Sequence, residues 1–82
     1  MRVFYTPEFK EAIKRCSLEV EKKLYKQVGY LFQNLRHPSL HAKKYDETKG
    51  IWQARVDRGY RFYFLFAEDK IFISRPLLRS GN

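Results

Sequence analysis

Two stretches of alternating residues, 51–56 and 60–66, constrain the fold of this chain more than any other feature. Every second residue in each stretch has an apolar side chain. Because side chains alternate between the two faces of a β-strand, this period indicates two strands, each with one face in a core. Only residues 57–59 separate them, which predicts a hairpin. The apolar sets are Trp52, Ala54 and Val56, and Tyr60, Phe62, Phe64 and Phe66.

The register of this hairpin follows from its turn. A two-residue turn would place Val56 opposite Arg61, an apolar group facing a charge. A three-residue turn, with Gly59 in the left-handed conformation, places Val56 opposite Tyr60 and gathers the large apolar groups on one face. The second register is therefore predicted.

This register has a chemical consequence on the other face of the hairpin. Arg55 lies directly opposite Arg61, and Gln53 lies opposite Tyr63. Like charges directly across a sheet are destabilising, so two guanidinium groups held on an open face indicate an anion-binding role.

The first half of the chain predicts a strand and a two-helix hairpin. Residues 2–5 are β-prone, and Thr6 is the expected cap of a helix that starts at Pro7. Ser17 caps a second helix that ends near residue 35 or 36, because Pro38 disfavours helical geometry before it. The apolar stripe of this helix is Val20, Leu24, Val28, Leu31, Phe32 and Leu35, and the residues expected to face away are Lys22, Lys23, Lys26 and Gln27.

After the hairpin, a turn at residues 68–69 leads to a third antiparallel strand, and the tail from Leu77 onward is expected to be irregular. A further short strand is expected over residues 42–45. The pairs expected on the core face are Phe66 with Ile71 and Phe64 with Ile73. The resulting fold class is α+β.

The composition limits the partners and the compartment. The 82 residues suffice for one domain, residues 1–82, and they carry a formal net charge of +8. Such an excess favours a polyanionic partner: nucleic acid, an anionic membrane or an acidic protein. No apolar run is long enough to cross a membrane, and the lone Cys16 fits a reducing, cytoplasmic setting.

The order of one strand, two helices and three antiparallel strands resembles the RelE/ParE toxin superfamily. Four segments carry the resemblance, which extends over nearly the whole chain. They are His37–Leu40 (HPSL), Lys43–Lys44, residues 50–56 (GIWQARV) and residues 60–64 (YRFYF). The resemblance implies helices packed on one face of a mostly antiparallel sheet.

The resemblance also implies one of two activities. RelE-like members enter the ribosomal A site and cleave mRNA, whereas ParE-like members act on DNA gyrase without nuclease activity. The YRF run favours the RelE-like branch, a ribosome-dependent mRNA endonuclease of a type II toxin–antitoxin module. The implied partners are the ribosome, mRNA and a cognate acidic antitoxin, with no cofactor. No metal is required where arginines stabilise the charge on the phosphate.

Site residues follow from the same resemblance. Arg61 matches the family's hairpin arginine and is the expected transition-state stabiliser, with Arg55 beside it on the phosphate. Arg79 falls near a histidine found in many relatives, and Tyr63 is the nearest group able to transfer a proton. The expected RNA-binding residues are Lys43, Lys44, Arg58 and Arg75.

Two departures from the family pattern bear on catalysis. The ribosome-dependent nucleases often carry two lysines at the positions of Gln53 and Arg55, so one cation remains here. Residues 74–80 contain neither a histidine nor a tyrosine, and arginine is a poor general base. A weak nuclease, an RNA-binding homologue without chemistry and a gyrase inhibitor therefore stay open.

Plain structural roles are expected for several other residues. His37 and His41 lack partners at metal-ligand spacing, so a solvated or helix-capping role is expected. Trp52 is expected in the core and Cys16 packed at a helix junction. Tyr63 is equally suited to packing and to stacking on a base.

Overall fold

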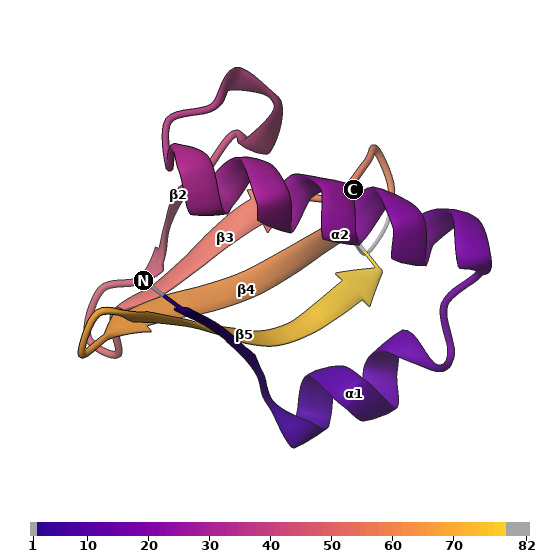
Figure 1. Ribbon diagram of the computed structural model, residues 1–82, viewed down its shortest axis with the longest axis horizontal. Coiled ribbons are helices and arrows are strands. Elements are labelled where there is room, and N and C mark those ends of the chain that lie inside the picture. Colours follow the sequence, from indigo (N-terminus) through magenta and orange to yellow (C-terminus); the bar gives the residue numbers. More distant parts are fainter. Residues whose placement is uncertain (1, 79–82) are drawn as a thin grey trace.

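The computed structural model describes residues 2–78 of the chain, and side chains over residues 2–74. The elements are β1 (Arg2–Tyr5), α1 (Pro7–Ile13), α2 (Leu18–Gln33), the 3-10 turn η1 (Pro38–Leu40), β2 (Lys43–Asp46), β3 (Ile51–Arg55), β4 (Tyr60–Ala67) and β5 (Lys70–Leu78). The strands form a five-stranded sheet in the order β1-β5-β4-β3-β2. All neighbours are antiparallel except β1 and β5, which are parallel. The predicted α+β class is confirmed, and Figure 1 shows α2 lying across one face of the sheet.

The predicted register of the hairpin is confirmed, but its turn differs. The pairs are Trp52 with Phe64, Gln53 with Tyr63, Ala54 with Phe62 and Arg55 with Arg61. Gly59 is not left-handed: among the glycines of residues 2–78, only Gly50 has a positive φ. Instead, the Asp57 carboxylate accepts hydrogen bonds from the main-chain N–H groups of Gly59 and Tyr60, at 2.8 and 3.0 Å. A short polar side chain therefore holds the turn that a left-handed glycine was expected to form.

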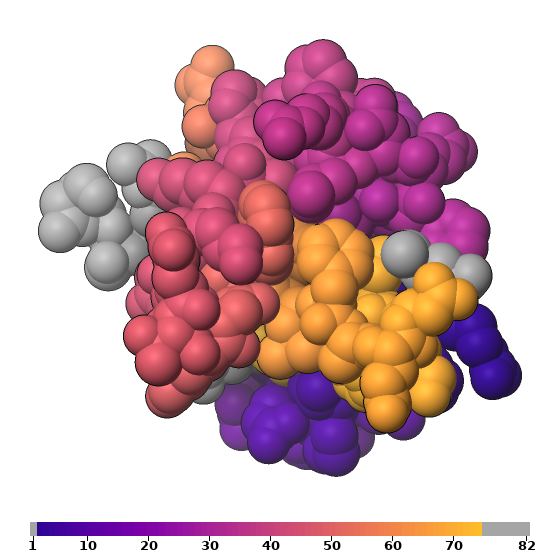
Figure 2. All heavy atoms as spheres, turned by 90° about the vertical axis from the view of Figure 1, so that its left-hand side faces the viewer, coloured from indigo at the N-terminus to yellow at the C-terminus, as the bar shows by residue number. Residues whose placement is uncertain are grey.

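Strand β5 extends further than the sequence indicated. The predicted pairs Phe66 with Ile71 and Phe64 with Ile73 are confirmed. The expected irregular tail is wrong for Leu77 and Leu78, which pair with Arg61 and Tyr60 and so continue the backbone hydrogen bonding along β4. Figure 2 looks at the end of the sheet where the β2–β3 turn (red) lies beside the β4–β5 turn (orange).

Both helices begin at the predicted caps. The Thr6 hydroxyl accepts a hydrogen bond from the Phe9 N–H at 3.1 Å, and the Ser17 hydroxyl accepts one from the Val20 N–H at 3.2 Å. Helix α2 ends at Gln33, before the predicted residue 35 or 36, because Asn34 is already extended with φ −162°. Neither described helix combines the length and the hydropathy needed to cross a bilayer.

Two residues of α2 face opposite to the prediction. Gln27, expected in solvent, is 7% exposed, and Phe32, expected in the core, is 49% exposed. The Gln27 Nε2 donates hydrogen bonds to the main-chain carbonyls of Arg55 and Ser39, at 2.8 and 3.0 Å. The Gln27 Oε1 accepts one from the Ser39 hydroxyl at 3.1 Å. A buried amide needs partners for both its ends, and here they tie α2 to β3 and η1.

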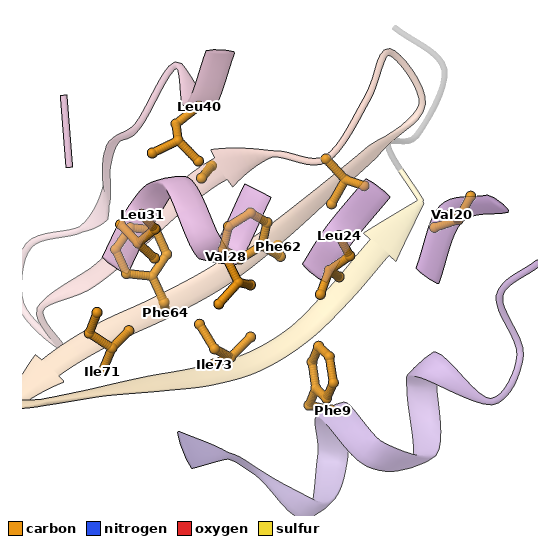
Figure 3. Packing of buried hydrophobic residues seen from close by; sticks show 12 residues of the cluster. Phe9, Val20, Leu24, Val28, Leu31, Leu40, Phe62, Phe64, Ile71 and Ile73 are labelled. Carbon is orange, nitrogen blue, oxygen red and sulfur yellow. The ribbon is translucent and has the colours of Figure 1, made fainter. Parts of the chain in front are cut away.

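The core fills the space between the helices and one face of the sheet, as Figure 3 shows. Trp52 and Cys16 pack against it, as predicted. Successive residues of a β-strand point to opposite faces of the sheet, so the residues before and after each core residue project from the face opposite the core. The buried members are Phe9, Val20, Leu24, Val28, Leu31, Leu40, Ala54, Val56, Phe62, Phe64, Ile71 and Ile73.

Candidate nucleic-acid interface

The face of the sheet opposite the core, called the open face below, carries the predicted arginines. Arg55 follows the buried Ala54 on β3, and Arg61 precedes the buried Phe62 on β4, so both project from the open face. Gln53 and Tyr63 share this face one pleat further along the same strands. The alternation that builds the core therefore also builds the interface.

Three cations of the open face surround one cavity. It has a volume of about 370 Å³ and is lined by His41, Ala42, Lys43, Gln53, Arg55 and Arg61. A concave surface lined by charges of one sign concentrates ligands of the opposite sign. The cavity is therefore suited to a small anionic group such as a phosphate.

The two arginines differ in their hydrogen bonds. Arg61 Nη1 donates to the main-chain carbonyls of Asp57 and Tyr60, at 3.3 and 3.4 Å, which orients its guanidinium group. Arg55 Nε is buried and has no hydrogen-bond partner in the described part of the chain. An unpaired donor is costly to bury, and Arg55 also lies opposite a like charge. An oxyanion bound in the cavity would relieve the repulsion between the two guanidinium groups.

His41 lines the cavity, although the sequence did not place it there. It follows η1 in the left-handed conformation, with φ 47° and ψ 44°. Strand β2 starts two residues later, and its Lys43 pairs with Gln53, which brings His41 to the arginine pair. The signal that could have located it was the pairing of β2 with β3, which the sequence does not specify.

His37 has the helix-capping role that was expected. Its Nδ1 accepts a hydrogen bond from the Ser39 N–H at 3.2 Å at the start of η1. Its ring stacks on Tyr30, with centroids 3.9 Å apart and planes 8° apart. Over residues 2–78, no three histidine, cysteine or carboxylate side chains gather as a metal ion would require.

The other predicted site residues lie in different places. Lys44 projects from the core side of β2, with its Nζ 5.1 Å from the Trp52 ring centroid, because alternation sends it away from Lys43. Arg58 is exposed in the β3–β4 turn and does not line the cavity. Tyr63 contacts the ring of Tyr45, with centroids 4.8 Å apart. Lys44 and Arg58 therefore do not line the cavity, and their expected role in RNA binding stays a prediction.

Two predicted residues cannot be located by their side chains. The backbone of Arg75 pairs with Tyr63 on β4, but its side chain lies outside the described residues. Arg79 lies outside them entirely. Among the predicted residues, the structure thus brings together Arg55, Arg61 and Lys43.

Solved structures share this architecture. YafQ from E. coli matches with a TM-score of 0.77 at 17% identity, over 94% of this chain and 91% of that one. RelE of the RelB–RelE antitoxin–toxin complex from Methanococcus jannaschii matches with a TM-score of 0.74 at 19% identity, over 93% and 89%. The archaeal RelE–RelB complex from Pyrococcus horikoshii gives 0.78 at 15% identity, over 99% and 97%. No protein-family model and no curated protein sequence matches the chain. The chain therefore has the fold of the RelE-like toxins.

Proposed function

We propose that this protein is the toxin of a type II toxin–antitoxin module and that it cleaves mRNA on the ribosome. The observation that carries the proposal is the Arg55–Arg61 pair, which shares one cavity with Lys43 and His41 on the open face. The fold, shared with RelE proteins solved in complex with RelB, supports the toxin role.

The chemistry of RNA cleavage assigns a task to each of these groups. The ribose 2′-oxygen attacks the adjacent phosphorus, the bond to the 5′-oxygen breaks, and negative charge develops on the other phosphate oxygens. Arg61 and Arg55 stabilise that charge, since guanidinium groups bind phosphate oxygens in pairs. Lys43 adds a third positive charge at the rim of the cavity.

A proton must also leave the 2′-hydroxyl and another must reach the 5′-oxygen. His41 is the group in the cavity best suited to this transfer, because imidazole is the commonest general acid–base in enzymes. Tyr63, on the same face beside Gln53, is the second candidate. Residues 74–80 contain no histidine or tyrosine that could transfer a proton. His41 would take over that role from a different position in the chain.

The test is the mapping of cut ends on mRNA translated in a purified cell-free system. Arg61→Ala is expected to lower the cleavage rate at least about 100-fold, the usual effect of removing one donor to developing charge. Arg15→Ala removes the same charge from an exposed residue that follows α1 and does not line the cavity, so it is expected to cleave normally. Wild-type cleavage by Arg61→Ala would contradict the mechanism.

A second candidate function is inhibition of DNA gyrase without cleavage. The observation in its favour is Gln53, an uncharged residue at a position where the ribosome-dependent nucleases often carry lysine. This function predicts inhibited supercoiling by the purified protein and intact mRNA in the cell-free system. The two assays, run on one preparation, separate the two functions.

We propose a small acidic antitoxin as the partner that neutralises this protein in the cytoplasm. A net charge of +8 favours an acidic protein, and the two archaeal RelE proteins were solved with their RelB partners. The expected result is growth arrest on expression of this chain alone and normal growth when a small acidic protein encoded beside it is expressed too.

A further inference from the structure

Tyr45 is a large exposed aromatic residue next to the cavity, and none of the roles assigned above uses it. Its side chain is 62% exposed. In β2, Lys43 pairs with Gln53 and Lys44 with Trp52, but Asp46 is the next residue to pair, with Ile51. Tyr45 is therefore the extra residue of a β-bulge, a feature that redirects a side chain.

The bulge directs the Tyr45 ring across the open face. The ring meets that of Tyr63, with centroids 4.8 Å apart and planes at 63°. Tyr45 belongs to β2 and Tyr63 to β4, and β3 lies between these strands. The ring must therefore extend over β3, where Gln53 pairs with both Lys43 and Tyr63.

The two rings lie beside the cations of the cavity. Tyr63 and Arg61 are two residues apart on β4, as are Gln53 and Arg55 on β3, which is about 7 Å at the usual rise per residue. A ligand that contacts both the aromatic rings and the cations must therefore carry a flat apolar group at a similar distance from a negative charge. A nucleotide has this build, with its base next to its phosphate.

We propose that the exposed ring of Tyr45, held edge-on by Tyr63, forms a platform on which one base of single-stranded RNA stacks, and that the Gln53 amide contacts the edge of this base. The inference rests on the RNA-directed function proposed above and adds a base-binding subsite to it. Stacking on aromatic side chains is the usual way in which proteins hold unpaired bases. Gln53 offers both a donor and an acceptor to the base edge, which a lysine at this position could not.

The test measures affinity rather than cleavage. Fluorescence anisotropy gives the affinity of the purified protein for a short 2′-O-methyl oligonucleotide, which cannot be cut, and for the same backbone without bases. Tyr45→Ala is expected to weaken binding of the first about fivefold to a hundredfold and to leave the second unchanged. Tyr45→Phe keeps the ring and is expected to bind both as the wild type does.

Phe32→Ala is the matched control, because Phe32 is an exposed aromatic residue on α2, which covers the opposite face of the sheet. It is expected to change neither affinity. The inference is overturned if Tyr45→Ala binds the intact oligonucleotide like the wild type, which would assign the exposed ring to a protein partner. It is also overturned if the wild type does not distinguish the two oligonucleotides, or if Phe32→Ala weakens binding as much.

The results separate this inference from the proposed nuclease. If base-dependent binding requires Tyr45 but translated mRNA stays intact, the platform stands and the nuclease proposal fails. If Arg61→Ala abolishes cleavage while Tyr45→Ala leaves base-dependent binding unchanged, the nuclease proposal stands and the platform is wrong.

Discussion

The side-chain amide of Gln27 donates a 2.8 Å hydrogen bond to the main-chain carbonyl of Arg55. The same nitrogen bonds the carbonyl of Ser39 at 3.0 Å, so one buried helical residue holds both segments that border the cavity. Replacing it removes this donor from two part-buried carbonyl groups. We expect Gln27→Leu to lower the free energy of unfolding by about 1–3 kcal/mol, measured by urea denaturation.

The control for this prediction is Gln33→Leu, the same substitution at an exposed position at the end of the same helix. It is expected to change stability by less than about 0.5 kcal/mol. Equal stabilities of the two variants would show that the buried amide does not connect the helix to the interface.

Removing the charge of Arg55 is expected to weaken RNA binding without destabilising the fold. Arg55→Met keeps most of the apolar stem but removes the buried Nε and the like-charge pair with Arg61. We expect unchanged stability or a gain of up to about 1 kcal/mol, together with weaker RNA binding. The slope of log affinity against log salt should fall by roughly 0.7, the value for one phosphate contact on a single strand. Arg15→Met, which makes the same change at an exposed residue outside the cavity, should leave that slope unchanged.

Gln53→Lys restores a cation at the position where the ribosome-dependent nucleases often carry lysine. It should tighten binding to the oligonucleotide backbone without bases and steepen the salt slope by roughly 0.7. Because Lys43 lies directly opposite, the fold should lose about 0.2–1 kcal/mol. The measurements are anisotropy titrations at several salt concentrations and urea denaturation. An unchanged slope would mean that residue 53 does not reach the nucleic acid.

The two histidines are expected to respond differently to glutamine. His41→Gln should slow mRNA cleavage by about 10²- to 10⁴-fold and leave the affinity for an uncleavable oligonucleotide unchanged, because a lost proton transfer acts on the reaction alone. His37→Gln should keep the cleavage rate and lower the stability by about 1 kcal/mol, since His37 caps η1. If His41→Gln cleaves mRNA as fast as the wild type, His41 is not the proton-transfer group and Tyr63 is the remaining candidate.

Alkaline pH should destabilise the fold through two tyrosines. Burial, and secondly the neighbouring Tyr25, raises the pKa of the Tyr5 phenol above 10.0. Burial, and secondly Glu21, raises the pKa of Tyr25 in the same way. A raised folded-state pKa means that the stabilisation is complete below the unfolded pKa and is lost as the pH rises through the folded pKa. Thermal unfolding from about pH 8 to 11 should show a midpoint that falls above about pH 10, and Tyr5→Phe should reduce that fall.

Period-two alternation was sufficient to predict the hairpin and the pairing of Arg55 with Arg61. The reason is physical: a shift by one residue would bury charges and expose Phe62 and Phe64, so a single register is stable. The caps at Thr6 and Ser17 were predictable for a similar reason, because they depend on neighbouring residues alone.

The parts that failed depend on contacts between distant residues. Gln27 looks like a solvent-facing helix residue until Ser39 and Arg55 are placed next to it. Phe32 looks like a core residue, but it lies about 100° around the helix from the buried Leu31, at the edge of the apolar stripe, and it is half exposed. His41 reaches the cavity only because β2 joins the edge of the sheet. The four residues of β2, Lys43–Asp46, have no alternating apolar pattern that would predict this pairing.

Strand β5 lies between β1 and β4, so the first strand of the chain has no neighbour until residues 70–78 have been synthesised. During translation the emerging polypeptide also lacks Ile71 and Ile73, which complete the core under the arginine-bearing hairpin. We expect the nascent chain to stay unfolded until this segment has left the exit tunnel.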